Sequence, residues 1–256
     1  MNIIQALILG IIQGITEFLP VSSSGHLALI QNLIGEVNVS FDVILHMATL
    51  LAVLVYFSKD IWNLIKGFFS FSWKDERFRT CIYIIIASIP IALIGYGFRY
   101  FIYSLFNNLY VVSLGFFISG MFLFTASFVS KRNKKFNLRN TFVIGLAQVL
   151  ALVPGISRSG STVSTGMLQG MDREKAIRFS FLLAIPAMIG AVLVNFTDIK
   201  PGTVEILPFV IGFIFAFVFG LFAINLFMKW LKIKRFRYFA YYCWILALIS
   251  LIVSLI

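Results

Sequence analysis

The sequence predicts an all-α membrane protein that crosses the bilayer several times. Of its 256 residues, 60% are hydrophobic and only 12% are charged, about half of the charged share of soluble domains. The mean hydropathy is +0.97, and several apolar runs approach the roughly 20 residues that a helix needs to cross a bilayer. The first apolar run lacks a basic segment and a cleavage site, so we expect it to belong to the mature protein rather than to a signal peptide.

We expect six membrane-spanning helices and two regions that enter the bilayer without crossing it. The six apolar runs with charged flanks are residues 41–57, 80–98, 109–129, 176–196, 206–228 and 238–256. Residues 2–34 and 140–170 are also apolar, but Pro, Gly and Ser interrupt each of them. Non-helical backbone at membrane depth is tolerated only inside protein or beside a water-filled cavity. Each interrupted region is therefore predicted to form a re-entrant helix–loop–helix.

The positions of the Lys and Arg residues predict which loops share one side of the membrane. Of the 21 Lys and Arg residues, all but three lie in four zones. These zones are residues 58–80, 131–139, 173–178 and 229–237. The positive-inside rule makes this side cytoplasmic, which leaves the two termini and the loop near 35–40 outside. Trp, Phe and cations are mixed in residues 58–79, which is typical of a helix lying on the membrane surface.

The two interrupted regions resemble each other. Five pairs of identical residues are each separated by 135 positions: Gly10 and Gly145, Gln13 and Gln148, Ser22 and Ser157, Ser24 and Ser159, and Gly25 and Gly160. We therefore interpret the chain as one membrane domain, 1–256, with a first repeat near 1–130 and a second near 136–256. Because three crossings reverse the direction of the chain, we expect two inverted-topology repeats, each a re-entrant helix–loop–helix followed by three transmembrane helices. Such folds place sites near the midplane, where broken helices meet.

The first interruption, within GITEFLPVSSSGH, gathers residues with catalytic potential. Glu17 and Gln13 are four positions apart and share one helix face, and a carboxylate in an apolar segment marks a functional site by default. Ser23 and His26 follow, and a histidine can activate a serine hydroxyl across one turn. The alternative is that the serines only cap the next helix.

The second interruption, PGISRSGST, has the composition of an anion-binding site. Glycines allow close approach of the backbone, and hydroxyls and N–H groups at a helix start bind oxyanions. Arg158 adds a planar cation that suits phosphate oxygens, or else pairs with Glu17; both roles can coexist around one anion. Together the interruptions supply the residues predicted to bind phosphate: Ser22, Ser24, Gly25, Ser157, Arg158, Ser159, Gly160 and Thr162. The spacing of a Walker P-loop is absent.

Other polar residues in the apolar spans are weaker candidates. Asp42 and His46 are four positions apart in the first span and would fit the same cavity, but a buried polar pair is an equal alternative. Cys81 and Cys243 form no metal motif and are interpreted as small packing residues. Nucleic acid is not expected as a partner, because the basic residues flank apolar spans and no nucleic-acid-binding motif is present.

The two motifs resemble those of the undecaprenyl-diphosphate phosphatases, the BacA/UppP family. QGITEFLPVSSSGH and PGISRSGST carry the resemblance, and FDVILHMATLLAVL and FSFLLAIPAMIGA extend it over essentially the whole chain. It implies a multi-pass enzyme of the bacterial cytoplasmic (inner) membrane that hydrolyses undecaprenyl diphosphate to undecaprenyl phosphate and inorganic phosphate. This reaction recycles the lipid carrier of peptidoglycan and cell-wall synthesis and is associated with bacitracin resistance.

The resemblance also implies roles for individual residues. Glu17 would be the essential acid, Ser23 and His26 the catalytic pair, and Arg158 the phosphate clamp, with Gln13 in support. A divalent cation, Mg²⁺ or Ca²⁺, is expected near Glu17. Our hypothesis is that Ser23, activated by His26, attacks the terminal phosphorus; water activated by His26, or His26 itself, is the rival nucleophile.

A transporter or flippase of a phosphorylated lipid is the alternative function, since inverted repeats with broken helices are common in secondary transporters. The expected partners are a polyprenyl diphosphate substrate and membrane lipid, and a homodimer is compatible with the sequence. Because the first interrupted region enters from outside, we expect the active site to open to the extracytoplasmic side.

Overall fold

The computed structural model describes residues 2–35, 39–129, 136–195, 206–230 and 236–255. The expected outer loop at 36–38, and parts of the basic zones at 131–139 and 229–237, lie outside these residues. Within them the chain is helical and contains no strand, which confirms the all-α class. The helices are α1 (Ile3–Phe18), α2 (Ser23–Ile34), α3 (Val39–Tyr56), α4 (Ser58–Phe68), α5 (Glu76–Gly97), α6 (Arg99–Phe106), α7 (Leu109–Ser127), α8 (Leu138–Leu150), α9 (Arg158–Leu168), α10 (Arg173–Asn195), α11 (Ile206–Trp230) and α12 (Phe236–Leu255).

Each of the six predicted spans is occupied by a helix. Five described helices, α5, α7, α10, α11 and α12, are long and apolar enough to cross a membrane. The remaining predicted span, residues 41–57, corresponds to α3. This helix meets α4 at a bend of 75°, and the bent pair can count as one further span. The chain is therefore a multi-pass membrane protein.

The two interrupted regions form helical hairpins, as predicted. α1 has 16 residues and α8 has 13, which correspond to lengths of roughly 24 Å and 20 Å. Both are shorter than the hydrocarbon core of a bilayer, about 30 Å. Neither helix is therefore long enough to cross the bilayer alone, and a turn at membrane depth has to find its backbone hydrogen bonds within the protein.

The predicted surface helix at 58–79 is shorter than expected, and one short helix was not predicted. α4 ends at Phe68, and α5 begins at Glu76, four positions before the expected span. The reason is the cap on α5, because the Asp75 carboxylate accepts a hydrogen bond from the backbone N–H of Arg77 at 2.8 Å. Hydrogen bonds from Arg77 lower the pKa of Asp75 to about 2, so this cap stays charged. The unpredicted helix, α6, lies between the second and third spans.

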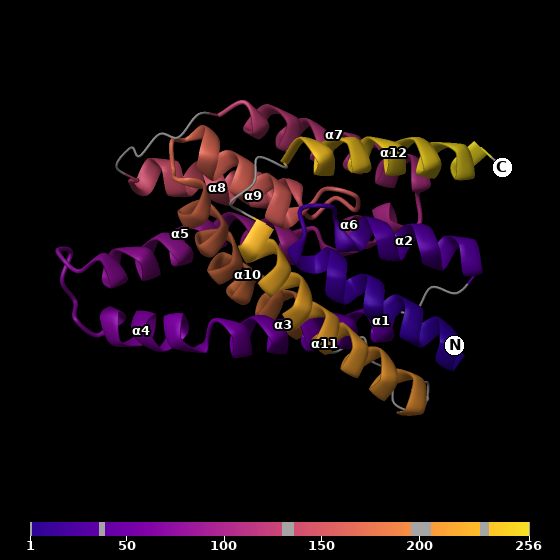
Figure 1. Cartoon of the computed structure of the whole chain (residues 1–256), viewed down its shortest axis with the longest axis horizontal. Coiled ribbons are helices and arrows are strands. Elements are labelled where there is room, and N and C mark those ends of the chain that lie inside the picture. The colour runs from indigo at the N-terminus through magenta and orange to yellow at the C-terminus, as the bar shows by residue number, and fades with distance from the viewer. Residues whose placement is uncertain (1, 36–38, 130–135, 196–205, 231–235, 256) are drawn as a thin grey trace.

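The helices pair in a pattern that links the two halves of the chain. α1 packs along α11, and α8 packs along α5; α3 contacts α11, and α10 contacts α5. α7 and α12, the last helices of the two predicted repeats, lie side by side along one edge (Figure 1). Figure 1 also shows both chain ends at one end of the molecule and α4 at the other, which agrees with the arrangement that the charges predict.

Corresponding glycines of the two hairpins allow the same kind of close packing. A Cβ atom on Gly10 would lie 2.6 Å from the carbonyl oxygen of Gly212 in α11, and one on Gly145 would lie 2.7 Å from that of Ala87 in α5. Small residues are what let membrane helices approach this closely. Gly10 and Gly145 thus have the same packing role in the two hairpins, whereas the inversion of one repeat relative to the other stays a prediction.

The backbone of the turn between α8 and α9 is held against α7 by the Ser119 hydroxyl and by close packing at Gly115. Gly155 has a φ of +90°, a conformation that side chains disfavour. The Ser119 hydroxyl in α7 donates to the Gly155 carbonyl at 2.8 Å and accepts from the Ser157 N–H at 2.7 Å. A Cβ atom on Gly115 would lie 2.2 Å from the carbonyl oxygen of Pro154. α7 therefore sets the position of the residues that follow the turn.

We expect Gly115→Ala to destabilise the protein, because backbone atoms leave no space for the added methyl group. Such overpacking costs about 1–3 kcal/mol. Gly190→Ala is the matched control, since no atom lies within 4 Å of its Cβ position. Thermal unfolding in detergent should show a lower midpoint for Gly115→Ala alone. Equal midpoints for the two variants would contradict the packing described here.

Candidate active site

The two hairpins meet through an ion pair between Glu17 and Arg158. Glu17 lies in the last turn of α1, and Arg158 is the first residue of α9. Arg158 Nη2 donates to Glu17 Oε1 at 2.7 Å, and only 13% and 7% of the two side chains are exposed. Residues 141 positions apart thus join the two interruptions at one buried point, as the sequence predicts.

The second carboxylate oxygen of Glu17 is held by residues of the first hairpin. Ser23 Oγ donates to Glu17 Oε2 at 2.5 Å, and Gln13 Nε2 donates to the same atom at 3.0 Å. His46 Nε2 lies 3.9 Å from it. Glu17 is therefore surrounded by donors, and its position is determined by both hairpins and by α3.

The two weaker candidates in α3 separate. His46 reaches the site, with its Nδ1 2.8 Å from the Asp42 carbonyl oxygen. The Asp42 carboxylate instead accepts a hydrogen bond from Gln31 Nε2 at 2.6 Å. His46 thus fits the shared-cavity interpretation, whereas the Asp42 carboxylate is paired with Gln31 rather than with His46.

Ser23 and His26 form their hydrogen bonds with different partners. His26 Nδ1 lies 2.6 Å from the Ser22 carbonyl oxygen, and because a carbonyl only accepts, Nδ1 carries a proton. In the neutral ring, Nε2 then accepts from the Tyr242 hydroxyl, 2.8 Å away. The ring also stacks on Tyr242, with 5.8 Å between centroids. The expected activation of Ser23 by His26 thus has no hydrogen bond to support it here, because the ring is turned back toward Ser22 and the Ser23 hydroxyl bonds to Glu17.

Two of the five hydroxyls predicted to bind phosphate, those of Ser22 and Ser157, act as helix caps. Ser22 Oγ accepts from the Gly25 N–H at 3.2 Å, and Ser157 Oγ accepts from the Gly160 N–H at 3.0 Å. In both hairpins the capping serine also lies close to the serine two positions later. The Ser22 and Ser24 hydroxyls are 3.2 Å apart, and those of Ser157 and Ser159 are 3.3 Å apart. The capping alternative is realised in both hairpins, and in the same way.

Of the remaining members of the predicted phosphate set, Ser159 and Gly160 contact the turn of the first hairpin, and Thr162 bonds to its own helix and to α10. Ser159 Oγ donates to the Leu19 carbonyl at 3.0 Å, and a Cβ atom on Gly160 would lie 3.3 Å from the Pro20 carbonyl oxygen. Thr162 Oγ1 donates to the Arg158 carbonyl at 2.7 Å and lies 2.7 Å from Ser180 Oγ. These residues shape the site by fixing its backbone.

The groups left to bind an anion are one guanidinium nitrogen and backbone amides. Arg158 Nη1 is buried and has no hydrogen-bond partner among the described residues. The first amides of a helix have no partner within that helix, and a helix N-terminus favours negative charge. α2 begins at Ser23 and α9 at Arg158, so two N-termini adjoin the Glu17–Arg158 pair. The arrangement is suited to an oxyanion next to a serine hydroxyl.

The site offers few metal ligands. Among the described residues, no group of three or more His, Cys, Asp or Glu side chains is placed to hold a metal ion. Among the described residues, Gln13 Oε1 is buried without a hydrogen-bond partner, and the Gln13 side chain contacts Glu17. Within the described part of the site, this amide oxygen and the Glu17 carboxylate are therefore the candidate oxygen ligands, and His46 Nε2 lies 3.9 Å from Glu17.

Two residues that position the site were missed from the sequence. Tyr242, in α12, bonds to His26, and Ser119, in α7, holds the second turn. A buried tyrosine hydroxyl usually has a partner, so a tyrosine in an apolar span is a signal. Because Tyr241 directly precedes it, the sequence does not show which tyrosine reaches the site.

Residues 6–249 match the family model of the bacitracin resistance protein BacA. This chain belongs to the BacA family. Among its curated relatives are the undecaprenyl-diphosphatases of Methanobrevibacter smithii (39% identical, over 97% of this chain and 96% of the relative), Halothermothrix orenii (40%, over 99% and 99%) and Christiangramia forsetii (38%, over 98% and 98%).

We expect Ser159→Ala to weaken this BacA-family fold more than Ser161→Ala does. Ser159 donates to Leu19 across the two turns, whereas Ser161 Oγ donates to the Arg158 carbonyl in its own helical turn. Loss of the bond between the turns should lower the free energy of unfolding by about 1 kcal/mol. Thermal unfolding of the two variants in detergent is the measurement, and an equal loss in both would refute the structural role of Ser159.

Proposed function

We propose that this protein is a membrane phosphatase that hydrolyses undecaprenyl diphosphate to undecaprenyl phosphate and inorganic phosphate. The observation that carries the proposal is the buried Arg158, which pairs with Glu17 through Nη2 and keeps Nη1 without a partner among the described residues. The activity named for the relatives supports it. The reaction would return the lipid carrier to cell-wall synthesis and, by removing undecaprenyl diphosphate, would account for the bacitracin resistance in the family's description.

Phosphate binding in this proposal depends mainly on electrostatics. Phosphoryl transfer requires that the charge on the transferred group be neutralised and that the attacking and leaving oxygens be aligned. Arg158 Nη1 and the first-turn amides of α2 and α9 would bind the terminal phosphate. Preorganised donors of this kind are worth far more in a water-poor site than in solution.

Ser23 is the proposed nucleophile, and Glu17 is the proposed base. The Ser23 hydroxyl already donates to Glu17 Oε2 at 2.5 Å. Ser23 Oγ attacks the terminal phosphorus and its proton passes to Glu17, while the bond from that phosphorus to the bridging oxygen breaks and undecaprenyl phosphate leaves. Water then hydrolyses the phosphoserine, which releases inorganic phosphate and restores the hydroxyl. This assignment replaces the hypothesis that His26 activates Ser23, and it leaves His26 to act on the water.

A divalent cation, Mg²⁺ or Ca²⁺, is compatible with this donor set. Glu17 and the unpaired Gln13 Oε1 would hold it, with the diphosphate and water supplying other ligands, as is usual for Mg²⁺. When bound, such an ion neutralises diphosphate charge.

We further propose that the protein resides in the bacterial cytoplasmic membrane, with its site open to the outer side. The basic zone around α4 and the two chain ends lie at opposite ends of the molecule (Figure 1). The positive-inside rule assigns the basic end to the cytoplasm. The first hairpin, which begins near the N-terminus, then enters from outside.

We expect purified protein in detergent to release phosphate from undecaprenyl diphosphate. Arg158→Ala should lower kcat/KM by about 100- to 1,000-fold, because it removes a charged donor from the reacting phosphate. Arg139→Ala, an exposed arginine in α8, should change it less than about two-fold. A transporter would release no phosphate, since detergent leaves no compartment to transport across, and that result would overturn the proposal.

We expect rapid quenching during turnover to trap phosphate on the peptide that contains Ser23. Ser23→Ala should abolish the label and lower kcat by about 1,000-fold or more, as for other lost nucleophiles. A label on His26, or near-normal turnover by Ser23→Ala, would contradict the serine mechanism.

A further inference from the structure

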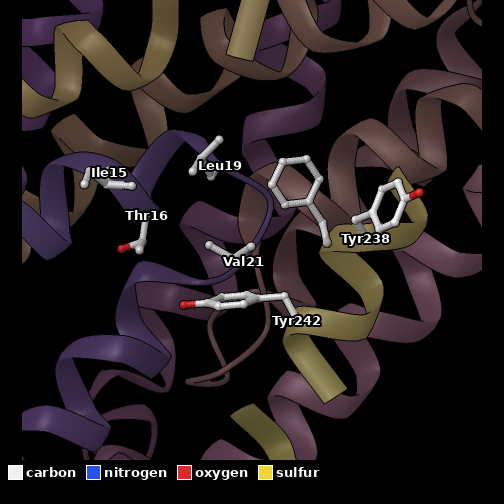
Figure 2. Close-up of a pocket in the computed structure, with 7 residues that line it drawn as sticks. Ile15, Thr16, Leu19, Val21, Tyr238 and Tyr242 are labelled. Carbon is white, nitrogen blue, oxygen red and sulfur yellow. The ribbon is translucent and has the colours of Figure 1, made fainter. Parts of the chain in front are cut away.

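A cavity of about 530 Å³ lies between the end of α1 and the first half of α12. Its walls include Ile15 and Thr16 of α1, Leu19 and Val21 of the following turn, and Tyr242 of α12. Figure 2 shows Leu19, Val21 and Tyr242 arranged along this space, with the turn of the first hairpin passing beside them. We infer that this cavity holds the isoprenoid segment next to the diphosphate. The inference rests on the proposed function and adds the part of the site that recognises the hydrocarbon.

The chemistry of the walls favours a hydrocarbon occupant. The Thr16 hydroxyl already donates to the Ile12 carbonyl at 2.7 Å, and the Tyr242 hydroxyl is bonded to His26. The side chains of Ile15, Leu19, Val21 and Phe239 carry no polar atom, and Tyr238 adds one further hydroxyl to the wall. A polar ligand would thus lose its hydration and gain few hydrogen bonds, which is unfavourable, whereas the volume is within the range of about 300–1,000 Å³ usual for ligand pockets.

The cavity adjoins the residues proposed to carry the reaction through Tyr242, and two of its other lining residues are chain neighbours of site residues. Thr16 directly precedes Glu17, and Val21 directly precedes Ser22, whose carbonyl binds the His26 ring. Tyr242 forms part of the wall and donates its hydroxyl to His26 Nε2. A chain lying against Tyr242 is therefore one side chain away from His26.

We expect the cavity to select among substrate chains by their shape rather than by their hydrophobicity. A lipid chain in the bilayer is already surrounded by hydrocarbon, so entering the cavity gains little from leaving water, and close packing is what remains. A hydrophobic pocket discriminates by about 10- to 200-fold when it gains or loses a small apolar group. A bulkier wall should therefore penalise substrates with isoprenoid chains more than substrates with almost none.

The test compares Ile15→Trp with Ile8→Trp. Ile8 lies seven positions earlier on α1, on nearly the same helix face; it is exposed and is not part of the cavity wall. We measure kcat/KM for a fifteen-carbon polyprenyl diphosphate and for a five-carbon allylic diphosphate. Ile15→Trp should lower the ratio of the two values by about 10-fold, and Ile8→Trp should change it less than two-fold.

An unchanged ratio in Ile15→Trp, or an equal fall in both variants, would overturn the inference and leave the phosphatase intact. Failure of the wild-type protein to release phosphate from either substrate would instead refute the proposed function. Ile15→Phe adds less volume at the same place and serves if Ile15→Trp does not elute as a folded protein. Its ratio is expected to fall in the same direction, and no fall counts against the cavity.

Discussion

The ion pair of Glu17 with Arg158 is the constraint on which the rest of the site depends. A charged side chain at the centre of a membrane helix costs about 2.5–3.5 kcal/mol on insertion scales, and removing one partner of a buried pair costs about 3–5 kcal/mol. Neither charge is therefore tolerable without the other. Glu17 ends a helix too short to cross the bilayer, and Arg158 begins another short helix. Their attraction requires that the two hairpins meet within the protein, and every other contact of the site serves that meeting.

Packing and capping provide the backbone hydrogen bonds that the two turns need where the hairpins meet. At membrane depth the amide and carbonyl groups of a turn need partners within the protein, and in both hairpins serines supply such bonds. Ser22 and Ser157 cap their helices in the same way, and Ser159 links the turns. The described hydroxyls of Ser22, Ser157 and Ser159 are thus already engaged in the structure of the two turns. The groups left for chemistry are the Arg158 guanidinium, the Ser23 hydroxyl and the first-turn amides, a smaller set than the motif suggests.

How much of this was predictable depends on the range of the interaction. Pro, Gly and Ser clusters act locally, so the broken helices and the helix-start serines could be read from the sequence, and so could the joining of Glu17 to Arg158, because buried charges need partners. The side-chain direction of His26 could not, since it follows from the carbonyl of Ser22 and from a tyrosine 216 positions away. The end of α4 was missed for a similar reason: apolar and charged residues continue past it, but the cap at Asp75 begins a new helix.

The two hairpins also show how a repeated unit can yield an asymmetric site. Counting 135 positions on from Ser23 gives Arg158, and each is the first residue of the second helix in its hairpin. The two equivalent positions bind the two oxygens of one carboxylate, Ser23 at Oε2 and Arg158 at Oε1. The carboxylate itself has no counterpart, because Leu152 stands 135 positions after Glu17. A symmetric pair of hairpins would place two serines or two arginines around the centre. The two equivalent positions instead hold the proposed nucleophile and a cation on opposite sides of one acid, and neither hairpin contains all three side chains.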